Sequence, residues 1–255
     1  MTLPSLLAVF AHPDDESLSA GGVLAGHAAA GARTSVLTAT WSEGTPRAAE
    51  LADAVSILGA GQPRLLGYAD ARVPESAPGR PRLCEAPLDE AVGALVAHIR
   101  EFHPSIVVTH DALGGLTGHP DHVHTHRICL LAAQAAGLAG LYPQAGAPWR
   151  PDAVYAATHP QSFVRQLGNK VPRAAGRTLH AVPDDWIGAA VDVAPWLDTK
   201  YAAILAHRSE VARGAAPGIL AAMPEPERAA FLSTEYFVRH DLAPGSHRTT
   251  ELSAG

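Results

Sequence analysis

The sequence predicts an α/β fold of the Rossmann-like kind, a doubly wound, mostly parallel sheet with helices on both faces. Short runs of consecutive apolar residues, such as residues 6–10, are typical of strands that are buried on both faces. Helical patterns alternate with these runs, which is the order of parallel βαβ units. The chain has 255 residues, 47% of them hydrophobic, and we expect residues 1–255 to form a single domain.

In the first part of the chain, strands and helices alternate with recognisable boundaries. The predicted elements are a strand at 5–11, a helix from Ser17 to about Ala30, a strand at 34–41, a helix at 45–58 and a strand at 64–68. Pro46 suits the first turn of its helix, and Gly31 and Gly59 follow helix ends. Gly21 and Gly22 are poor helix formers, so we expect another segment to approach the helix closely there.

Residues 70–87 interrupt this alternation, because they are rich in proline and charge and show no period. We interpret them as a rim or lid of a site. The later predicted elements are a helix at 88–102, a strand at 105–110, a helix to about Ala136, a strand at 153–158, a strand at 187–193 and a helix from Pro195 to about Arg213. Residues 161–177 are poorly patterned, and residues 241–255 are expected to be a frayed tail.

The composition excludes several classes of partner. The net charge of −6 and the pI near 6.1 give no basic field for nucleic acid or for an anionic membrane. No segment is predicted to span a membrane, and the apolar run near the N-terminus is too short for a signal peptide. Cys84 and Cys129 match no metal-binding spacing and are expected to be reduced. We expect a cytoplasmic protein with a small-molecule substrate, and the sequence leaves open whether it forms a homo-oligomer.

The first polar cluster is residues 11–16 (AHPDDE), directly after the first predicted strand. Open α/β sheets bind their ligands at the carboxyl ends of strands. A histidine among carboxylates is a composition that suits a zinc-class ion. The alternative is structural, since Asp15, Glu16 or Ser17 could each cap the following helix or supply a first-turn charge.

The second polar cluster follows the strand at 105–110. His110 and Asp111 end this strand, a glycine-rich turn comes next, and residues 119–122 (HPDH) begin the following helix. His119 and His122 are three positions apart, so they point to the same side of a starting helix. Two such clusters after two strands favour one shared metal site over two unrelated helix caps.

In this order and spacing, the two motifs resemble those of the zinc-dependent N-acetylglucosaminyl deacetylases, the PIG-L or LmbE-like family. The resemblance covers the first two-thirds of the chain, and Lys200 with residues 207–209 (HRS) resembles the C-terminal signature of the family. It implies a hydrolase that removes the N-acetyl group from an N-acetylglucosamine-containing glycoconjugate. The alternative within this class is an amidase that cuts a larger acyl group, as in mycothiol-conjugate or antibiotic-tailoring enzymes. The sequence determines neither the aglycone nor the length of the acyl chain.

The resemblance implies that His12, Asp15 and His122 bind the metal and leave one position for water. The implied ion is Zn²⁺, with Fe²⁺ as the alternative in vivo. His126 lies four residues after His122 and could replace Asp15 as a ligand, but two histidines and one carboxylate are the commoner open site.

The resemblance also assigns the catalytic steps. Asp14 would be the general base that takes a proton from the water. His119, as an imidazolium, would stabilise the oxyanion or protonate the leaving amine. Asp121 would hold His119 in the required tautomer and raise its pKa. The presence of both Asp14 and His119 argues against a sugar-binding protein without catalytic activity.

Further residues are candidates for substrate contacts. Arg47, Glu50 and Asp70 occupy places where family members contact sugar hydroxyls, although Arg47 and Glu50 could also be an exposed pair on a helix. His110 could touch the substrate or support the metal ligands. Thr117 stands where several mycothiol-pathway members carry a tyrosine thought to assist at the oxyanion, so another group would replace that tyrosine here.

Overall fold

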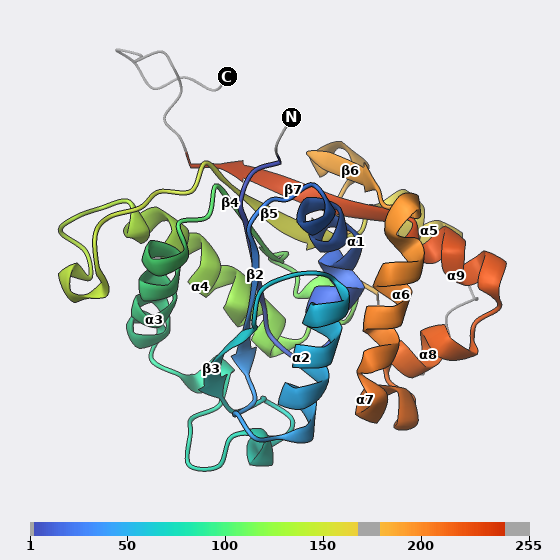
Figure 1. Ribbon diagram of the computed structural model, residues 1–255, viewed down its shortest axis with the longest axis horizontal. Coiled ribbons are helices and arrows are strands. Elements are labelled where there is room, and N and C mark those ends of the chain that lie inside the picture. The colour runs from blue at the N-terminus through green and yellow to red at the C-terminus, as the bar shows by residue number, and fades with distance from the viewer. Residues whose placement is uncertain (1–2, 168–178, 243–255) are drawn as a thin grey trace.

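The computed structural model describes residues 3–167 and 179–242, and it contains a seven-stranded sheet with helices on both faces (Figure 1). The strands are β1 (Leu6–Phe10), β2 (Thr34–Thr40), β3 (Arg64–Tyr68), β4 (Ile106–His110), β5 (Ala153–Thr158), β6 (Ala189–Asp192) and β7 (Thr234–Asp241). Their order in the sheet is β3-β2-β1-β4-β5-β7-β6. The first five are parallel, and β7 is antiparallel to both β5 and β6. The predicted mostly parallel α/β fold is confirmed.

Two helical layers cover the sheet. The helices are α1 (Asp15–Ala29), α2 (Pro46–Ile57), α3 (Leu88–Phe102), α4 (Pro120–Ala136), α5 (Gln161–Leu167), α6 (Leu197–Ala206), α7 (Arg208–Ala212), α8 (Ala216–Ala222) and α9 (Glu225–Leu232). Alternate residues of β1 point to opposite faces. Leu6, Ala8 and Phe10 belong to the core under α1, α2 and α6, whereas Leu7 and Val9 belong to the core under α3 and α4 (Figure 1).

The sheet reverses its winding direction between β1 and β4. The chain first proceeds from β1 to β2 and β3, and then crosses back through α3 to β4 on the other side of β1. In the pairing of these strands, Ala8 lies beside Val108. The loops that follow β1 and β4 therefore emerge next to each other, at the place where such sheets bind ligands.

The second half of the chain differs from the prediction in several places, and among them α8 and α9 were not predicted. Strand β7 was not predicted, because the buried Glu235 interrupts the apolar alternation expected of a strand. The helix predicted from Pro195 to about Arg213 is broken at His207, whose ψ of 63° is not helical. Residues 161–167 form α5, while 168–178 and 243–255 lie outside the described residues, and with them most of the expected frayed tail.

A buried ion pair explains the two glycines inside α1. Lys200 Nζ lies 2.8 Å from Glu235 Oε1, and both side chains are 2% exposed. The carboxylate of Glu235 also accepts the backbone N–H groups of Gly22 and Val23, at 2.8 and 2.9 Å. A Cβ atom on Gly22 would lie 2.3 Å from the Cβ of Val193. The expected close approach to this helix is confirmed.

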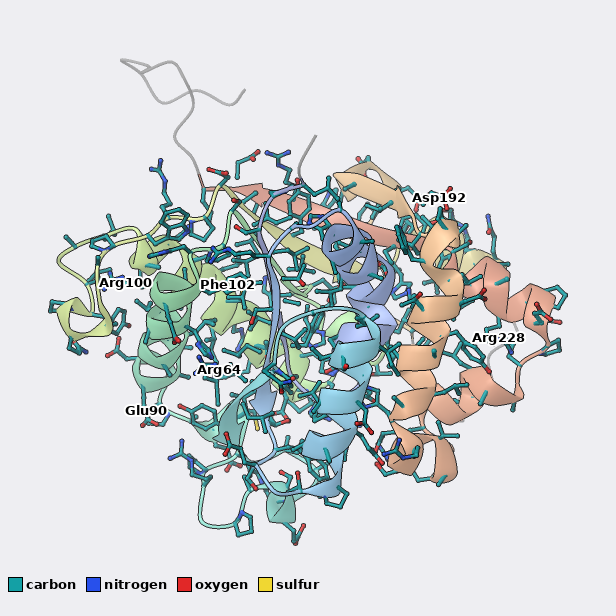
Figure 2. All side chains as sticks on the ribbon, in the orientation of Figure 1. Arg64, Glu90, Arg100, Phe102, Asp192 and Arg228 are labelled. Carbon is teal, nitrogen blue, oxygen red and sulfur yellow. The ribbon has the colours of Figure 1, made fainter. Side chains whose placement is uncertain are left out.

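Arg100 on α3, labelled in Figure 2, is buried and closes the C-terminal end of α4. Carbonyl groups in the last turn of a helix have no partner within the helix. The Arg100 guanidinium donates to the carbonyl oxygens of Ala135, Ala136, Leu138, Leu141, Tyr142 and Gly146. It thereby fixes α3, α4 and the loop that leads to β5.

Both cysteines are free, as expected. Cys129 is buried, and burial raises the pKa of its thiol to about 12, so it is an unreactive core residue. Among the described residues, none of the helices has both the length and the apolar character needed to cross a membrane.

Replacing Gly22 with alanine tests the contact between α1 and Val193. We expect the Gly22→Ala variant to lose about 1–3 kcal/mol of unfolding free energy, because the Cβ of Val193 cannot rotate away from the added methyl group. Urea unfolding measures this loss. The control is Gly140→Ala, whose added Cβ meets nothing within 4 Å. Equal stability of the two variants would show that the contact is not tight.

Candidate active site

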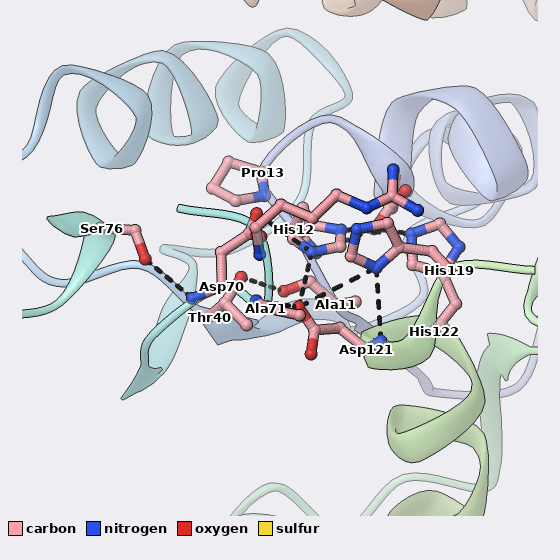
Figure 3. Close-up of polar contacts among 12 residues, drawn as sticks. Ala11, His12, Pro13, Thr40, Asp70, Ala71, Ser76, His119, Asp121 and His122 are labelled. Atoms are coloured by element: carbon pink, nitrogen blue, oxygen red, sulfur yellow. Dashed lines mark hydrogen bonds and ion pairs between the residues drawn. The ribbon is translucent and has the colours of Figure 1, made fainter. Parts of the chain in front are cut away.

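The two polar clusters of the sequence meet above the carboxyl ends of β1 and β4 (Figure 3). His12 Nδ1 lies 3.1 Å from His122 Nε2 and 3.2 Å from Asp15 Oδ2. The distance from His122 Nε2 to Asp15 Oδ2 is 3.3 Å. The convergence predicted from the sequence is therefore confirmed, while the roles of these residues as metal ligands stay predictions.

These three atoms have the spacing of ligands on one metal ion. A tetrahedral zinc site with bonds of about 2.0–2.1 Å separates its ligand atoms by about 3.3–3.4 Å. The three observed separations are within a few tenths of an ångström of this value. Two imidazole nitrogens and one carboxylate oxygen are also a donor set that zinc-class ions take. The residues present fit such an ion.

The other nitrogen of His12 faces carboxylates. Its Nε2 is 3.2 Å from Asp121 Oδ2 and 3.3 Å from Asp70 Oδ2 (Figure 3). Asp121 Oδ2 is fixed in turn by the N–H of Ala71, at 2.8 Å. A proton on Nε2 leaves Nδ1 free to bind a metal. Burial opposes a charge on His12, but the hydrogen bonds with Asp121 and Asp15 raise its pKa to about 10, so the surroundings favour a cation here.

His119 and Asp121 differ from the expectation. His119 caps α4, and its Nδ1 accepts the N–H of Asp121 at 3.3 Å, so the proton of the neutral ring is on Nε2. Burial, followed by the neighbouring His12 and His122, lowers the pKa of His119 to about 3. This lowered pKa favours a neutral imidazole over the expected imidazolium, while the catalytic role of His119 stays a prediction. The Asp121 carboxylate is 3.9 Å from His119 Nδ1 and closer to His12, which it supports instead.

His110 lies behind the cluster and is only 3% exposed. Its ring stacks on His122 with centroids 3.9 Å apart, and its Nε2 is 3.3 Å from Asp15 Oδ2. Burial and the neighbouring His122 lower the pKa of His110 to about 4. This position favours support of the cluster over substrate contact. His126 bonds the His110 carbonyl at 2.8 Å and belongs to none of the potential ligand groups found in the described residues.

Asp14 has an unusual backbone conformation. Its φ of 129° lies in a region that residues with a side chain rarely adopt, and such a conformation costs about 1–3 kcal/mol. Burial, followed by the charge of Asp15, raises the pKa of Asp14 to about 7. Burial also opposes the charge of Asp15, but His122 and His110 hold the pKa of Asp15 well below its usual range. Two adjacent carboxyl groups are therefore suited to different tasks.

Glu16 and His207 form a buried pair next to Asp14, and the sequence predicted no catalytic role for this pair. Glu16 and His207 are both 0% exposed, and His207 Nε2 lies 2.8 Å from Glu16 Oε1. The same oxygen accepts the Ser17 hydroxyl at 2.6 Å, and Oε2 accepts the backbone N–H of Asp14 at 3.0 Å. The sequence signals for this pair were the place of Glu16 in the first polar cluster and the resemblance of residues 207–209 to the C-terminal family signature.

Arg47 and Glu50 are both 6% exposed, so the alternative of an exposed helix pair is wrong. Arg47 lies 3.3 Å from Asp14 Oδ1 and 3.3 Å from Glu210 Oε1. Glu50 accepts the backbone N–H and the hydroxyl of Ser209, at 2.9 and 2.6 Å. The segment after α6 covers this face of α2, which its sequence period could not reveal.

The remaining substrate candidates lie at the edge of the cluster. Asp70 is 5% exposed, and its Oδ1 accepts the backbone N–H of Arg72 at 2.7 Å. The bond from Ala71 to Asp121 ties the start of residues 70–87 to the site, while their role as a lid stays a prediction. Thr117 is exposed in a 3₁₀ turn, two positions before His119.

Comparisons with known proteins agree with this geometry. Residues 7–133, which include both clusters, match the family described as PIG-L: GlcNAc-PI de-N-acetylase. The chain is 37% identical over 241 residues to the 1D-myo-inositol 2-acetamido-2-deoxy-alpha-D-glucopyranoside deacetylase of Rhodococcus jostii (strain RHA1), covering 81% of each protein.

Two solved structures share the fold. A conserved protein from Thermus thermophilus is 27% identical with a TM-score of 0.64, and the match covers 99% of this chain and 100% of that one. The N,N'-diacetylchitobiose deacetylase from Pyrococcus horikoshii is 18% identical with a TM-score of 0.64, covering 94% and 84% of the two chains. The fold similarity thus extends over nearly the whole sequence.

Removing the Arg47 guanidinium tests the buried charge network. We expect Arg47→Ala to lower the unfolding free energy by about 3 kcal/mol, because buried carboxylates lose their counter-charge. Chemical denaturation measures the change. The control is Arg208→Ala: Arg208 and its partner Asp53 are 66% and 54% exposed, so its loss should cost less than about 1 kcal/mol. A similar small loss in both variants would contradict the network.

Proposed function

The chain belongs to the PIG-L family of GlcNAc-PI de-N-acetylases, and we propose that it is a metal-dependent hydrolase that removes the N-acetyl group from an N-acetylglucosamine-containing glycoconjugate. The observation that carries the proposal is the approach of His12 Nδ1, Asp15 Oδ2 and His122 Nε2 to within 3.1, 3.2 and 3.3 Å of one another. The inositol N-acetylglucosaminide in the name of the Rhodococcus relative is therefore the first substrate to test.

We propose that His12, Asp15 and His122 hold a Zn²⁺ ion, with Fe²⁺ as the alternative. Two imidazoles and one carboxylate leave one coordination position open. Bound there, such an ion lowers the pKa of water and polarises a carbonyl group. Asp121 keeps the Nε2 proton of His12 in place, which directs Nδ1 toward the ion.

The chain's own residues supply the proton transfers. Asp14, as a carboxylate, accepts a proton from the attacking water, and then returns it to the amine that leaves. A pKa near 7 suits a group with both tasks. The Nε2–H of His119 donates a hydrogen bond to the carbonyl oxygen as negative charge develops on it. Water and the N-acetyl amide thereby give acetate and the free amine.

We propose that Asp70 and Thr117 contact the sugar, because Asp70 lies 3.3 Å from His12 Nε2 and Thr117 is exposed in the turn that precedes His119. Arg47 is paired with Asp14 and is 6% exposed, so its influence on the substrate goes through Asp14. His110 acts on the ligands Asp15 and His122, and not on the substrate.

Metal removal tests the proposed reaction. We expect the purified protein to contain zinc or iron by mass spectrometry and to release acetate from the N-acetylglucosaminyl inositol. Activity should disappear after treatment with a chelator and return with Zn²⁺. Full activity of the metal-free protein would contradict the proposal. Release of longer acyl groups but not acetate would identify an amidase for larger acyl chains instead.

Replacing Asp14 with alanine tests the base. We expect Asp14→Ala to bind metal like the wild type and to lose about 10²–10⁴-fold in turnover, because the water then has no proton acceptor. Steady-state acetate release and metal analysis measure the two properties. The control is Asp53→Ala, an exposed carboxylate of α2, which should keep full activity. Normal turnover in Asp14→Ala would assign the base to another group.

A further inference from the structure

We propose that Glu16, held by His207, is a positioning residue that fixes Asp14 in the orientation in which it accepts a proton. The inference rests on the proposed role of Asp14 as the base. Glu16 and His207 are both buried, and neither is among the proposed metal ligands. The proposal gives this pair a task in the reaction.

The backbone of Asp14 is held by Glu16 in an unusual conformation. With φ at 129° and ψ at −27°, it has a conformation that L-residues rarely adopt. Its side chain makes no capping hydrogen bond to the backbone of α1, and its N–H donates to Glu16 Oε2 at 3.0 Å. The bond fixes the peptide plane from which φ is measured, so together with this φ it helps to define the direction of the Asp14 side chain.

Both carboxylate oxygens of Glu16 already have hydrogen-bond partners within the protein. Oε2 serves Asp14, and Oε1 lies 2.6 Å from the Ser17 hydroxyl and 2.8 Å from His207 Nε2. The side chain is 0% exposed, so it reaches neither solvent nor substrate. Its influence on the reaction therefore goes through Asp14.

His207 is itself held in place by the break between two helices and by the residues that follow it. At His207 the chain leaves the helical conformation between α6 and α7, which directs the ring toward α1. Two residues later, Ser209 donates its N–H and hydroxyl to Glu50 on α2. These bonds fix the segment 207–209 against the helix that follows β2, so the ring of His207 has a defined position.

The same segment reaches Asp14 by a second route. Glu210 pairs with Arg47, and Arg47 pairs with the Asp14 carboxylate, each at 3.3 Å. One route thus holds the backbone of Asp14, through Glu16 and His207, and the other holds its side chain. A segment far along the chain controls both.

Kinetics of Glu16→Leu and His207→Leu test the proposal. We expect kcat to fall about 100-fold in each, the effect of a misplaced catalytic group, with KM and bound metal unchanged. Glu16→Gln keeps one oxygen for the Asp14 N–H and should recover most of the rate. Arg208→Ala, next to His207 but exposed, is the control with wild-type kcat. Circular dichroism and metal analysis measure the fraction of each variant that is folded and contains metal, and each kcat is calculated for that fraction.

A double-mutant cycle separates positioning from stability. In the Asp14→Ala background, Glu16→Leu should cause no further loss of the residual kcat, because the group that it positions is gone. An equal loss in both backgrounds, or wild-type kcat in folded Glu16→Leu, would overturn the proposal. If Glu16→Leu does not fold, His207→Leu replaces it in the cycle and decides by the same criteria. Full activity of Asp14→Ala would instead refute the base assignment itself, so the two failures are distinguishable.

Discussion

The pairing of β1 with β4 is the constraint on which the site depends. These strands are neighbours in the sheet because the chain winds outward through β2 and β3 and then returns across β1. Two loops about a hundred residues apart in sequence therefore emerge side by side, and His12 meets His122 at 3.1 Å. Neither loop alone offers three donors to one ion. The donor set is a consequence of the winding order, which brings together loops that are each short and locally simple.

Burial then divides tasks among similar side chains. Asp14 and Asp15 are adjacent and similarly buried, yet the pKa of Asp14 is raised to about 7 and that of Asp15 is held well below its usual range. Asp15 lies beside three imidazoles, and Asp14 lies beside the charge of Asp15. One carboxylate is thus suited to bind a cation and the other to exchange a proton. The histidines divide in the same way, since the pKa of His12 is raised among carboxylates and that of His119 is lowered among other rings.

The sequence could predict the features that are local. Apolar strands, helix boundaries and the two polar clusters each lie within a few residues, and together they predicted the fold class and the place of the site. It could not predict contacts such as that of Glu16 with His207, which are 191 positions apart. Arg47 and Glu50 have the spacing of a surface pair, and only the segment that returns 159 positions after Glu50 shows that they are buried. The broken helix at His207 also has a tertiary cause, because the break directs its ring toward Glu16.

Residues in the last third of the described chain hold residues of the first third in place. Lys200 and Glu235 hold the middle of α1, His207 holds Glu16 at its start, and Ser209 holds Glu50 on α2. These contacts reach the two helices that carry or flank the loop after β1, whereas the groups proposed to react all lie between residues 12 and 122. The region that matches the family, residues 7–133, therefore contains the proposed chemistry and the two residues that contact Asp14, Glu16 and Arg47. It does not contain His207 and Glu210, which hold Glu16 and Arg47 in turn. Because catalysis depends on geometry within fractions of an ångström, a segment without a reacting group can still determine the rate.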